Sequence, residues 1–253
     1  MGKLIAVANQ KGGVGKTTTA VNLSAALAAE GNRVLLIDID PQGNATSGLG
    51  VSLGPNDTTI YEVLVGQGGV GAAIRPSGIH GLDLLPSDSR LAGAEVELVS
   101  IDGRETVLRE ALLPYVARYH YVFADCPPSL GFLTLNALTA AQSVLVPIQC
   151  EYYALEGLGR LLETIERIQQ SLNPRLGVEG ILLTMYDSRL NLSMQVAEDA
   201  RRFFGGRVYN TMIPRNVRLG EAPSFGKPVT VYDPHCIGAA SYIGLAKEMM
   251  GHA

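Results

Sequence analysis

Asn9-Gln-Lys-Gly-Gly-Val-Gly-Lys-Thr-Thr18 is the stretch that decides the fold, because it combines closely spaced glycines with a lysine on either side of them. In a Walker A loop, backbone N–H groups surround the phosphates of a nucleotide, a lysine reaches the β- and γ-phosphates, and a Ser/Thr hydroxyl binds Mg²⁺. Gly15, Lys16 and Thr17 occupy these positions. The common pattern G-x-x-x-x-G-K-[ST] requires a glycine where this chain has Gln10. The stretch therefore predicts a phosphate-binding loop of a variant kind.

Lys11 adds a second cation beside the same phosphates. Two lysines that approach one phosphate group within one subunit would repel each other. We therefore hypothesise that Lys11 serves a nucleotide bound to another subunit, while Lys16 serves the nucleotide of its own subunit. The alternative is a glycine-rich turn that binds nothing, but three glycines, a lysine and a threonine in register argue against it.

The segments on both sides support the loop. Residues 3–8 form a short apolar run of strand length, and residues 16–30 are rich in Ala, Leu and Thr before a stop at Gly31 and Asn32. Strand, glycine loop and helix follow one another in the order that the motif requires. The phosphates would then lie at a helix N-terminus, where free N–H groups favour anions.

The composition indicates a single α/β domain over residues 1–253. The chain is 47% hydrophobic and 17% charged, and no interior linker divides it. The glycine cluster at 66–71 is short enough to be a surface loop. Further apolar runs predict a mostly parallel, twisted sheet flanked by helices. They lie at 33–37, 82–85, 121–124, 143–148, 178–184 and 208–213.

The same features predict a cytoplasmic protein. No signal peptide precedes the first strand, and no apolar stretch is long enough to cross a bilayer. Cys126, Cys150 and Cys236 are widely spaced and odd in number, which favours reduced and mostly buried thiols.

Acidic residues end two of the predicted strands. Ligands of parallel sheets bind beyond the carboxyl ends of the strands, so these acids are candidate site residues. Asp125 ends a run that resembles a Walker B strand, whose carboxylate holds Mg²⁺ through water, although Asp125 could instead cap the next helix. Asp40 precedes Pro41 and is assigned to orient or activate the attacking water. Asp38 is assigned a supporting contact with the metal or with the loop.

Five stretches of the chain resemble the ParA family. They are Lys11-Gly-Gly-Val-Gly-Lys-Thr-Thr18, Asp38-Ile-Asp-Pro-Gln-Gly-Asn-Ala-Thr46, Asp125-Cys-Pro-Pro-Ser-Leu-Gly131, Gln149-Cys-Glu-Tyr-Tyr-Ala-Leu-Glu-Gly157 and Ile213-Pro-Arg-Asn-Val-Arg218. The resemblance covers essentially the whole chain and is strongest to the chromosomal members. It implies a single-domain P-loop NTPase of the deviant Walker A type, which hydrolyses ATP with Mg²⁺ and forms an ATP-bound sandwich homodimer.

Residue by residue, the resemblance implies a complete nucleotide site. Lys11, Lys16 and Asp40 would be catalytic, with Lys11 reaching the partner's phosphates. Thr17 would bind the metal directly and Asp125 through water. The nucleotide would be held by Lys11, Gly12, Gly13, Val14, Gly15, Lys16, Thr17 and Thr18, with Pro214 and Asn216 bordering the adenine.

The charge distribution leaves room for DNA binding by one region. The chain carries a net charge of −4, but residues 175–227 alone carry +3. Such a basic segment suits a local phosphate-binding patch on an otherwise acidic body, although arginines on a solvated helix face are also ordinary. Arg189 and Arg218 flank helix-like segments in stretches that match the family's DNA-contacting arginines. No base-reading motif is evident, so binding of double-stranded DNA would be independent of sequence.

The resemblance also implies partners and a cellular place. A ParB-type centromere-binding protein would stimulate hydrolysis, and the protein would partition chromosomes at the nucleoid; a replication initiator is a further partner that the resemblance leaves open. The main alternative is a MinD-like membrane ATPase. Residues 245–253 carry one lysine, Lys247, which is too little basic charge for a membrane anchor. Iron–sulfur and tyrosine-kinase relatives would need paired interface cysteines or a C-terminal tyrosine cluster, and neither pattern is present.

Overall fold

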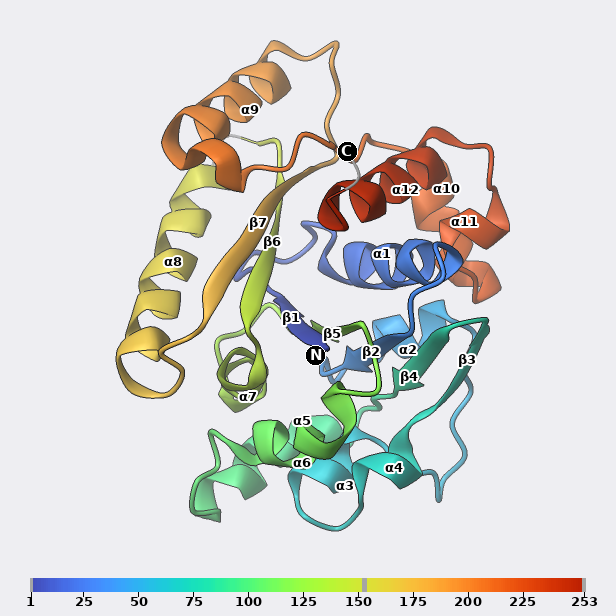
Figure 1. Ribbon diagram of the computed structural model, residues 1–253, viewed down its shortest axis with the longest axis vertical. Helices are drawn as coiled ribbons and strands as arrows, with labels where there is room; N and C mark the ends of the chain where they lie inside the picture. Colours follow the sequence, from blue (N-terminus) through green and yellow to red (C-terminus); the bar gives the residue numbers. More distant parts are fainter. Residues whose placement is uncertain (1, 152–153, 252–253) are drawn as a thin grey trace.

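Figure 1 shows the fold in a computed structural model that describes residues 2–151 and 154–251. Tyr152 and Tyr153, in one of the family-like stretches, lie outside the described residues. So do residues 252–253 at the end of the C-terminal segment and Met1.

Within the described residues, seven strands form one sheet in the order β3-β4-β2-β5-β1-β6-β7. Every neighbouring pair is parallel except β3 and β4, which are antiparallel. The strands are β1 (Lys3–Val7), β2 (Val34–Asp38), β3 (Arg75–Ile79), β4 (Leu82–Leu85), β5 (Tyr121–Asp125), β6 (Ser143–Gln149) and β7 (Gly177–Thr184). The predicted fold class, a mostly parallel sheet flanked by helices, is confirmed.

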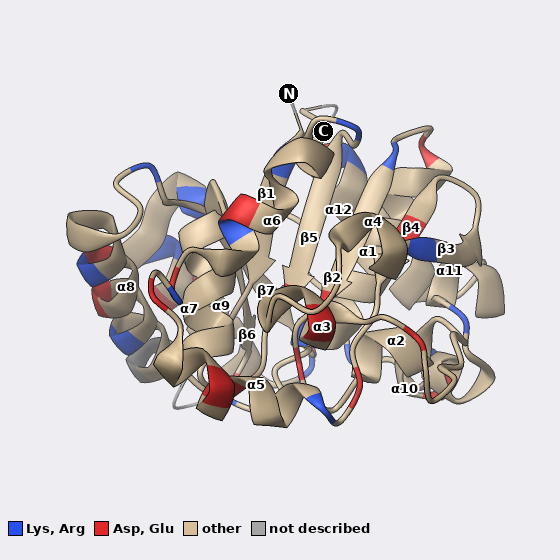
Figure 2. Cartoon of the chain, turned by 90° about the horizontal axis from the view of Figure 1, so that it is seen from below, with Lys and Arg blue, Asp and Glu red and all other residues tan. Residues whose placement is uncertain are grey.

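Two hydrophobic cores cover the two faces of the sheet. Successive strand residues point to opposite faces, so Leu4 and Ala6 enter one core while Ile5 and Val7 enter the other. This explains why the central strands are apolar throughout. The charged residues in Figure 2 lie mostly on the helices and loops around the sheet.

Helices pack on both cores (Figure 1). One core lies under α1 (Lys16–Ala29), α2 (Asn44–Gly48), α10 (Val217–Glu221), α11 (Val229–Tyr232) and α12 (Ile237–Met249). The other lies under α3 (Ile60–Leu64), α4 (Val70–Ala73), α5 (Leu91–Glu97), α6 (Val107–Val116), α7 (Phe132–Ala140), α8 (Ala154–Ser171) and α9 (Asn191–Phe204). Short 3-10 turns occur at Leu98–Ser100, Gly205–Arg207 and Ala222–Phe225. No described helix combines the length and the apolar character that a membrane crossing requires.

The predicted strand at 208–213 is not part of the sheet. It runs beside β7 and forms only isolated bridges there, between Ile181 and Val208 and between Tyr186 and Pro214. Between these bridges, the N–H groups of Asn210 and Thr211 donate to the Glu248 carboxylate of α12. Tyr209 and Ile213 still donate their N–H groups to carbonyl oxygens of β7. The Thr211 N–H between them goes to Glu248 instead, so the ladder is interrupted there.

The structure also contains a strand that the pattern did not predict. β3 includes Pro76 and Gly78, both of which are rare in strands, and its register with β4 is irregular between Pro76 and Ile79. Proline is tolerated at an edge because its missing N–H can face away from the sheet. The predicted loop at 66–71 is a loop up to Gly69, and α4 begins at Val70.

The parallel register brings the candidate acids to one edge of the sheet. Asp125 of β5 is level with Val7 at the end of β1 and with Asp38 at the end of β2. The glycine loop follows β1 directly, so the loop and the acids meet at this edge. Cys126 and Cys150 are buried free thiols, as expected, and Cys236 is half-buried.

Candidate active site

The glycine loop connects β1 to α1 and is anchored to the sheet at two points. Asn9 is buried, donates from its side-chain amide to the Pro147 carbonyl of β6, and accepts the Lys11 N–H at 3.0 Å. Farther along, the Thr184 hydroxyl of β7 donates to the Val14 carbonyl at 2.8 Å. These bonds orient the loop without using the N–H groups of its glycines.

Two glycines of the loop have left-handed backbone conformations. Gly13 has φ of +74° and Gly15 has φ of +86°. A residue with a Cβ atom adopts this region at a cost of about 1–2 kcal/mol, so glycine is favoured at both positions. Gly15 is the residue immediately before α1. The loop therefore ends at a helix N-terminus, where backbone N–H groups attract anions.

The two lysines of the loop face different surroundings. Lys16 is buried, with 7% of its surface exposed, and its ammonium donates to the Lys11 carbonyl at 3.1 Å. Burial lowers the pKa of Lys16, and the charge of Asp125 offsets part of this shift. The Lys11 side chain is partly exposed, and its ammonium contacts the Glu151 carboxylate just beyond β6. Lys16 thus bonds to its own loop, whereas the Lys11 side chain lies at the rim of the loop.

Asp125 is a buried carboxylate whose two oxygens have no hydrogen-bond partner among the described residues. Burial and the nearby Asp38 charge raise the pKa of Asp125 well above its usual range; the Thr17 hydroxyl and Lys16 offset part of the rise. An unpartnered carboxylate beside a threonine hydroxyl is an oxygen-rich position of the kind that Mg²⁺ prefers. The residues present therefore fit a Mg²⁺ ion between Thr17 and Asp125.

Asp38 and Asp40 form one hydrogen-bonded unit. The Asp38 carboxylate accepts the N–H and the hydroxyl of Thr46 as well as the Asp40 N–H. Burial nevertheless raises the pKa of Asp38 to about 6. The hydrogen bonds of Asp38 thus go to the loop after β2, and Asp40 lies on that loop with 7% of its surface exposed.

Two neighbouring cavities open at this edge of the sheet. The first, the loop cavity, has a volume of about 350 Å³ and is lined mainly by the glycine loop and the segment after β2. Its predicted lining residues are Gly12, Gly13, Gly15, Lys16, Thr17, Thr18 and Asp40. The second, the apolar cavity, has a volume of about 370 Å³. The two cavities share Gly15, Thr18 and Met185, so one elongated ligand can fill both.

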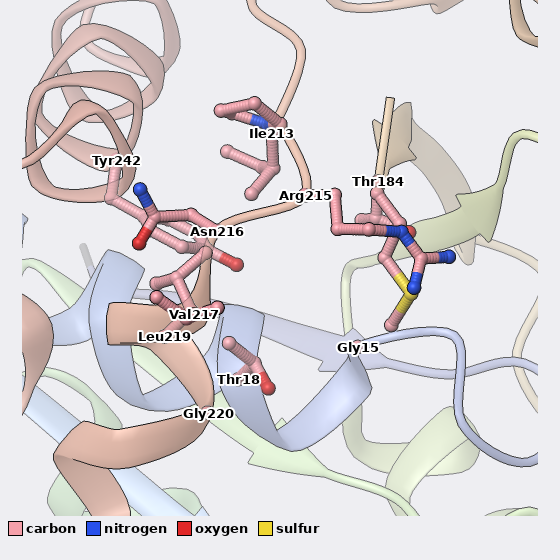
Figure 3. A pocket seen from close by; sticks show the side chains of 12 residues that line it. Gly15, Thr18, Thr184, Ile213, Arg215, Asn216, Val217, Leu219, Gly220 and Tyr242 are labelled. Atoms are coloured by element: carbon pink, nitrogen blue, oxygen red, sulfur yellow. The ribbon is translucent and has the colours of Figure 1, made fainter. Parts of the chain in front are cut away.

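Figure 3 shows how the apolar cavity is built. Asn216, Val217 and Leu219 lie on one side of it, Thr184 and Arg215 on the other, and Thr18 borders it from α1. The Asn216 side chain caps α10 by accepting the Arg218 N–H at 2.8 Å. Pro214 also lines this cavity, so both residues predicted to border a base lie here.

Arg189 and Arg218 line neither of these two cavities. The Arg189 guanidinium forms two hydrogen bonds to Asp187 while its side chain remains 86% exposed. These bonds lower the pKa of Asp187 to about 2. Arg218 is paired with Glu221 and Asp233. Both arginines reach solvent, and each already has a carboxylate partner.

Sequence reasoning missed several residues of the site. Gln42, Asn44, Pro128 and Met185 also line the loop cavity. Gln42, Asn44 and Pro128 follow the acidic strand ends, within two of the stretches that resemble the ParA family. The sequence could therefore have indicated them as site residues. Met185 follows β7 directly and has φ of +52°, a region that a bulky residue rarely adopts. No pattern in the sequence indicates that conformation.

Known proteins are similar to this chain over most of its length. Residues 2–178 match the protein family described as an AAA domain. The sporulation initiation inhibitor protein Soj of Bacillus subtilis (strain 168) is 55% identical over 249 residues, which cover 98% of both chains. The chromosome partitioning protein ParA of Caulobacter vibrioides (strain NA1000 / CB15N) is 55% identical over 250 residues, covering 98% of this chain and 94% of that protein.

A solved structure with bound nucleotide is also similar. Cobyrinic acid a,c-diamide synthase from Mycobacterium smegmatis, with bound ADP and magnesium, aligns with a TM-score of 0.86 and 41% identity. The alignment covers 100% of this chain and 95% of that one.

Proposed function

The chain belongs to the ParA/Soj family of chromosome-partitioning ATPases, and on that premise we propose how its single domain, residues 1–253, works. It binds ATP and Mg²⁺ in the two joined cavities and pairs with a second copy around the nucleotides. As a dimer it binds DNA without sequence preference, and hydrolysis of ATP to ADP and phosphate releases it. The placement of the two lysines carries this proposal, since Lys16 lies inside its own loop and Lys11 at the rim.

Within one subunit, the loop binds the phosphates and positions them for attack. Its N–H groups and Lys16 neutralise the charge on the transferring phosphoryl group, which is the main contribution of a protein to this reaction. Thr17 and Asp125 would hold Mg²⁺, which would supply further neutralisation of the phosphate charge. Asp40 lines the same cavity and orients the attacking water. The base lies in the apolar cavity between Pro214 and Asn216.

A second subunit completes the site. Lys11 is not among the described residues that line its own loop cavity, and its one recorded ionic partner, Glu151, is half-exposed. Lys11 can therefore leave its own subunit and reach the phosphates of a partner at small cost. Because the extra cation arrives only on pairing, dimerisation and hydrolysis are coupled.

DNA and a ParB-type protein are the proposed partners of the dimer, which would lie at the nucleoid. Two copies double the number of exposed arginines, and several weak phosphate contacts then act together. Arg189 and Arg218 are the proposed contacts, each after exchanging its carboxylate for a phosphate.

The test is a DNA-retention assay with ATP, with ADP and without nucleotide, repeated at raised salt. Retention that requires ATP and falls steeply with salt is the expected result. Sedimentation with ATP should show the dimer under the same conditions. ATP-dependent binding to anionic vesicles in place of DNA would overturn the proposal in favour of a membrane ATPase.

A further inference from the structure

Ser87 connects the end of β4 to the loop that carries Asp40. Its side chain is buried, with 2% of the residue exposed. The Ser87 hydroxyl donates to the Asp40 carbonyl at 2.8 Å, and the Ser87 N–H donates to the Thr46 hydroxyl oxygen at 3.0 Å. A serine from a neighbouring strand thus contacts two points of the segment after β2.

Thr46 closes this network from the other side. It is buried in α2, and its hydroxyl and its N–H both donate to Asp38 Oδ2, at 2.7 and 2.8 Å. The other carboxylate oxygen, Asp38 Oδ1, accepts the Asp40 N–H at 3.2 Å. The Asp40 residue is therefore held at its N–H through Asp38 and at its carbonyl through Ser87, together with the Gly43 N–H at 2.9 Å.

We propose that Thr46 and Ser87 are positioning residues for hydrolysis, because together they hold the backbone on both sides of Asp40 so that its carboxylate faces the loop cavity. This inference rests on the proposed role of Asp40 in orienting the attacking water. Neither Thr46 nor Ser87 is among the described residues that line the loop cavity, so neither contacts the nucleotide there. Both therefore act through other residues: Ser87 through the Asp40 carbonyl, and Thr46 through the Asp38 carboxylate.

The geometry predicts an effect on turnover and not on binding. A displacement of about 1 Å in a reacting group can lower a rate by roughly 100-fold, because alignment with the transition state is lost. ATP affinity depends on the glycine loop, Lys16 and the apolar cavity, which this network does not contact. The expected signature is therefore a lower kcat at an unchanged KM for ATP.

The test compares variants with and without the relevant hydroxyl. Thr46→Val keeps the shape of the side chain but loses the hydroxyl, and Ser87→Ala loses the bond to the Asp40 carbonyl. Each should lower the kcat of ATP turnover by about 10- to 100-fold and leave KM within about twofold. Thr46→Ser retains the hydroxyl and should recover most of the turnover. A fall in kcat of less than twofold in both Thr46→Val and Ser87→Ala would overturn the proposal.

Thr139→Val serves as the matched control. The Thr139 hydroxyl of α7 is buried and has no hydrogen-bond partner among the described residues, so its loss should leave kcat and KM unchanged. If Thr139→Val lowered kcat as much as Thr46→Val, the loss would reflect a general effect of buried hydroxyls, and the inference would fail. Thermal unfolding identifies any variant that does not fold, and Ser87→Ala then carries the test in place of Thr46→Val.

Asp40→Ala separates this inference from the function on which it rests. If Asp40→Ala abolishes turnover while Thr46→Val and Ser87→Ala do not lower it, the role of Asp40 holds and the positioning role is wrong. If Asp40→Ala retains turnover, the proposed role of Asp40 itself is wrong.

Discussion

The ammonium of Lys11 lies 3.1 Å from the Glu151 carboxylate of its own chain. The Gln149 side-chain amide also donates to this carboxylate. Both charged side chains are partly exposed, at 38% for Lys11 and 47% for Glu151. An ion pair of this exposure contributes about 0–1 kcal/mol, so the contact holds Lys11 only weakly.

Glu151→Gln should therefore favour the ATP-bound dimer. Release of Lys11 from its own subunit removes a cost of at most about 1 kcal/mol per subunit, or about 2 kcal/mol per dimer, which lowers the dimer dissociation constant by up to about 30-fold. Sedimentation equilibrium with ATP measures this constant. Glu30→Gln is the control. It removes the carboxylate partner of another exposed lysine, Lys247, and should leave the dimer dissociation constant unchanged. Weaker dimerisation by Glu151→Gln would mean that Glu151 itself takes part in the subunit interface.

Gly12→Val should separate ATP binding from dimerisation. A Cβ atom built at Gly12 meets no described atom within 4 Å, and Gly12 is not in the left-handed region. Gly12 lines the loop cavity, but no described atom stands where the added side chain would begin, so ATP binding should be retained. The added side chain stands beside the phosphates, where it blocks the close approach of a second subunit. Equilibrium ATP binding and sedimentation with ATP test the two halves of this prediction.

Gly13→Ala is the matched comparison for Gly12→Val. Gly13 has φ of +74°, so alanine strains this loop conformation by about 1–2 kcal/mol. If the free loop of the variant relaxes to relieve the strain, ATP must restore the conformation and should bind up to about tenfold more weakly. A dimer of Gly12→Val as stable as that of wild type would contradict close approach at this residue.

Asp125→Asn should stabilise the protein in the absence of Mg²⁺ and nucleotide. The raised pKa of Asp125 means that the folded state retains a proton at a pH where the unfolded chain has lost it. The contribution of Asp125 to the free energy of unfolding is therefore greatest at low pH. It falls as the pH rises from about 4, where the unfolded chain loses the proton, to the raised pKa of the folded state. Asparagine avoids the buried charge, so at pH 7.5 the variant should gain about 1–3 kcal/mol in the free energy of unfolding.

Chemical denaturation at several pH values checks the sign of this effect. The advantage of Asp125→Asn should shrink as pH falls toward 4, because wild-type Asp125 becomes neutral as well. ATP turnover should be lost at every pH if Asp125 holds Mg²⁺. An advantage that does not change with pH would mean that packing, not the buried charge, causes it.

The parts of the fold that the sequence predicts best are those with one dominant physical cause. The five inner strands are apolar because they are buried on both faces, and the glycine loop is recognisable because Gly13 and Gly15 adopt conformations that other residues avoid. Parallel strands then bring Asp38 and Asp125 to one edge without further information. Asp40 follows the carboxyl end of β2 and so lines the loop cavity at the same edge of the sheet.

The parts that the sequence does not predict depend on long-range contacts. The segment at 208–213 has a strand-like composition, but Glu248 of α12 takes the donors of Asn210 and Thr211. Ser87 follows a predicted strand, yet its bond to the Asp40 carbonyl joins residues 47 positions apart. The rule that ligands lie at the carboxyl ends of strands points toward Ser87, but only the structure shows which atoms it contacts.

Asp187→Asn should strengthen DNA retention, and Arg189→Gln should weaken it. The Asp187 carboxylate forms two hydrogen bonds to the Arg189 guanidinium, at 2.9 and 2.7 Å, and so competes with any phosphate for the same donors. Removing the carboxylate frees Arg189, whereas removing the guanidinium loses one phosphate contact per subunit. The slope of log affinity against log salt should therefore become shallower by about one for each arginine lost.

Arg202→Gln provides the control for net charge, because Arg202 is 73% exposed on α9 and has a weaker carboxylate partner, Asp199, at 3.7 Å. It removes the same charge as Arg189→Gln. If both variants reduced DNA retention equally, the effect would come from overall charge. The proposal that Arg189 contacts DNA directly would then be wrong. If only Arg189→Gln reduces it, and Asp187→Asn raises it, DNA replaces the Asp187 carboxylate at the Arg189 guanidinium.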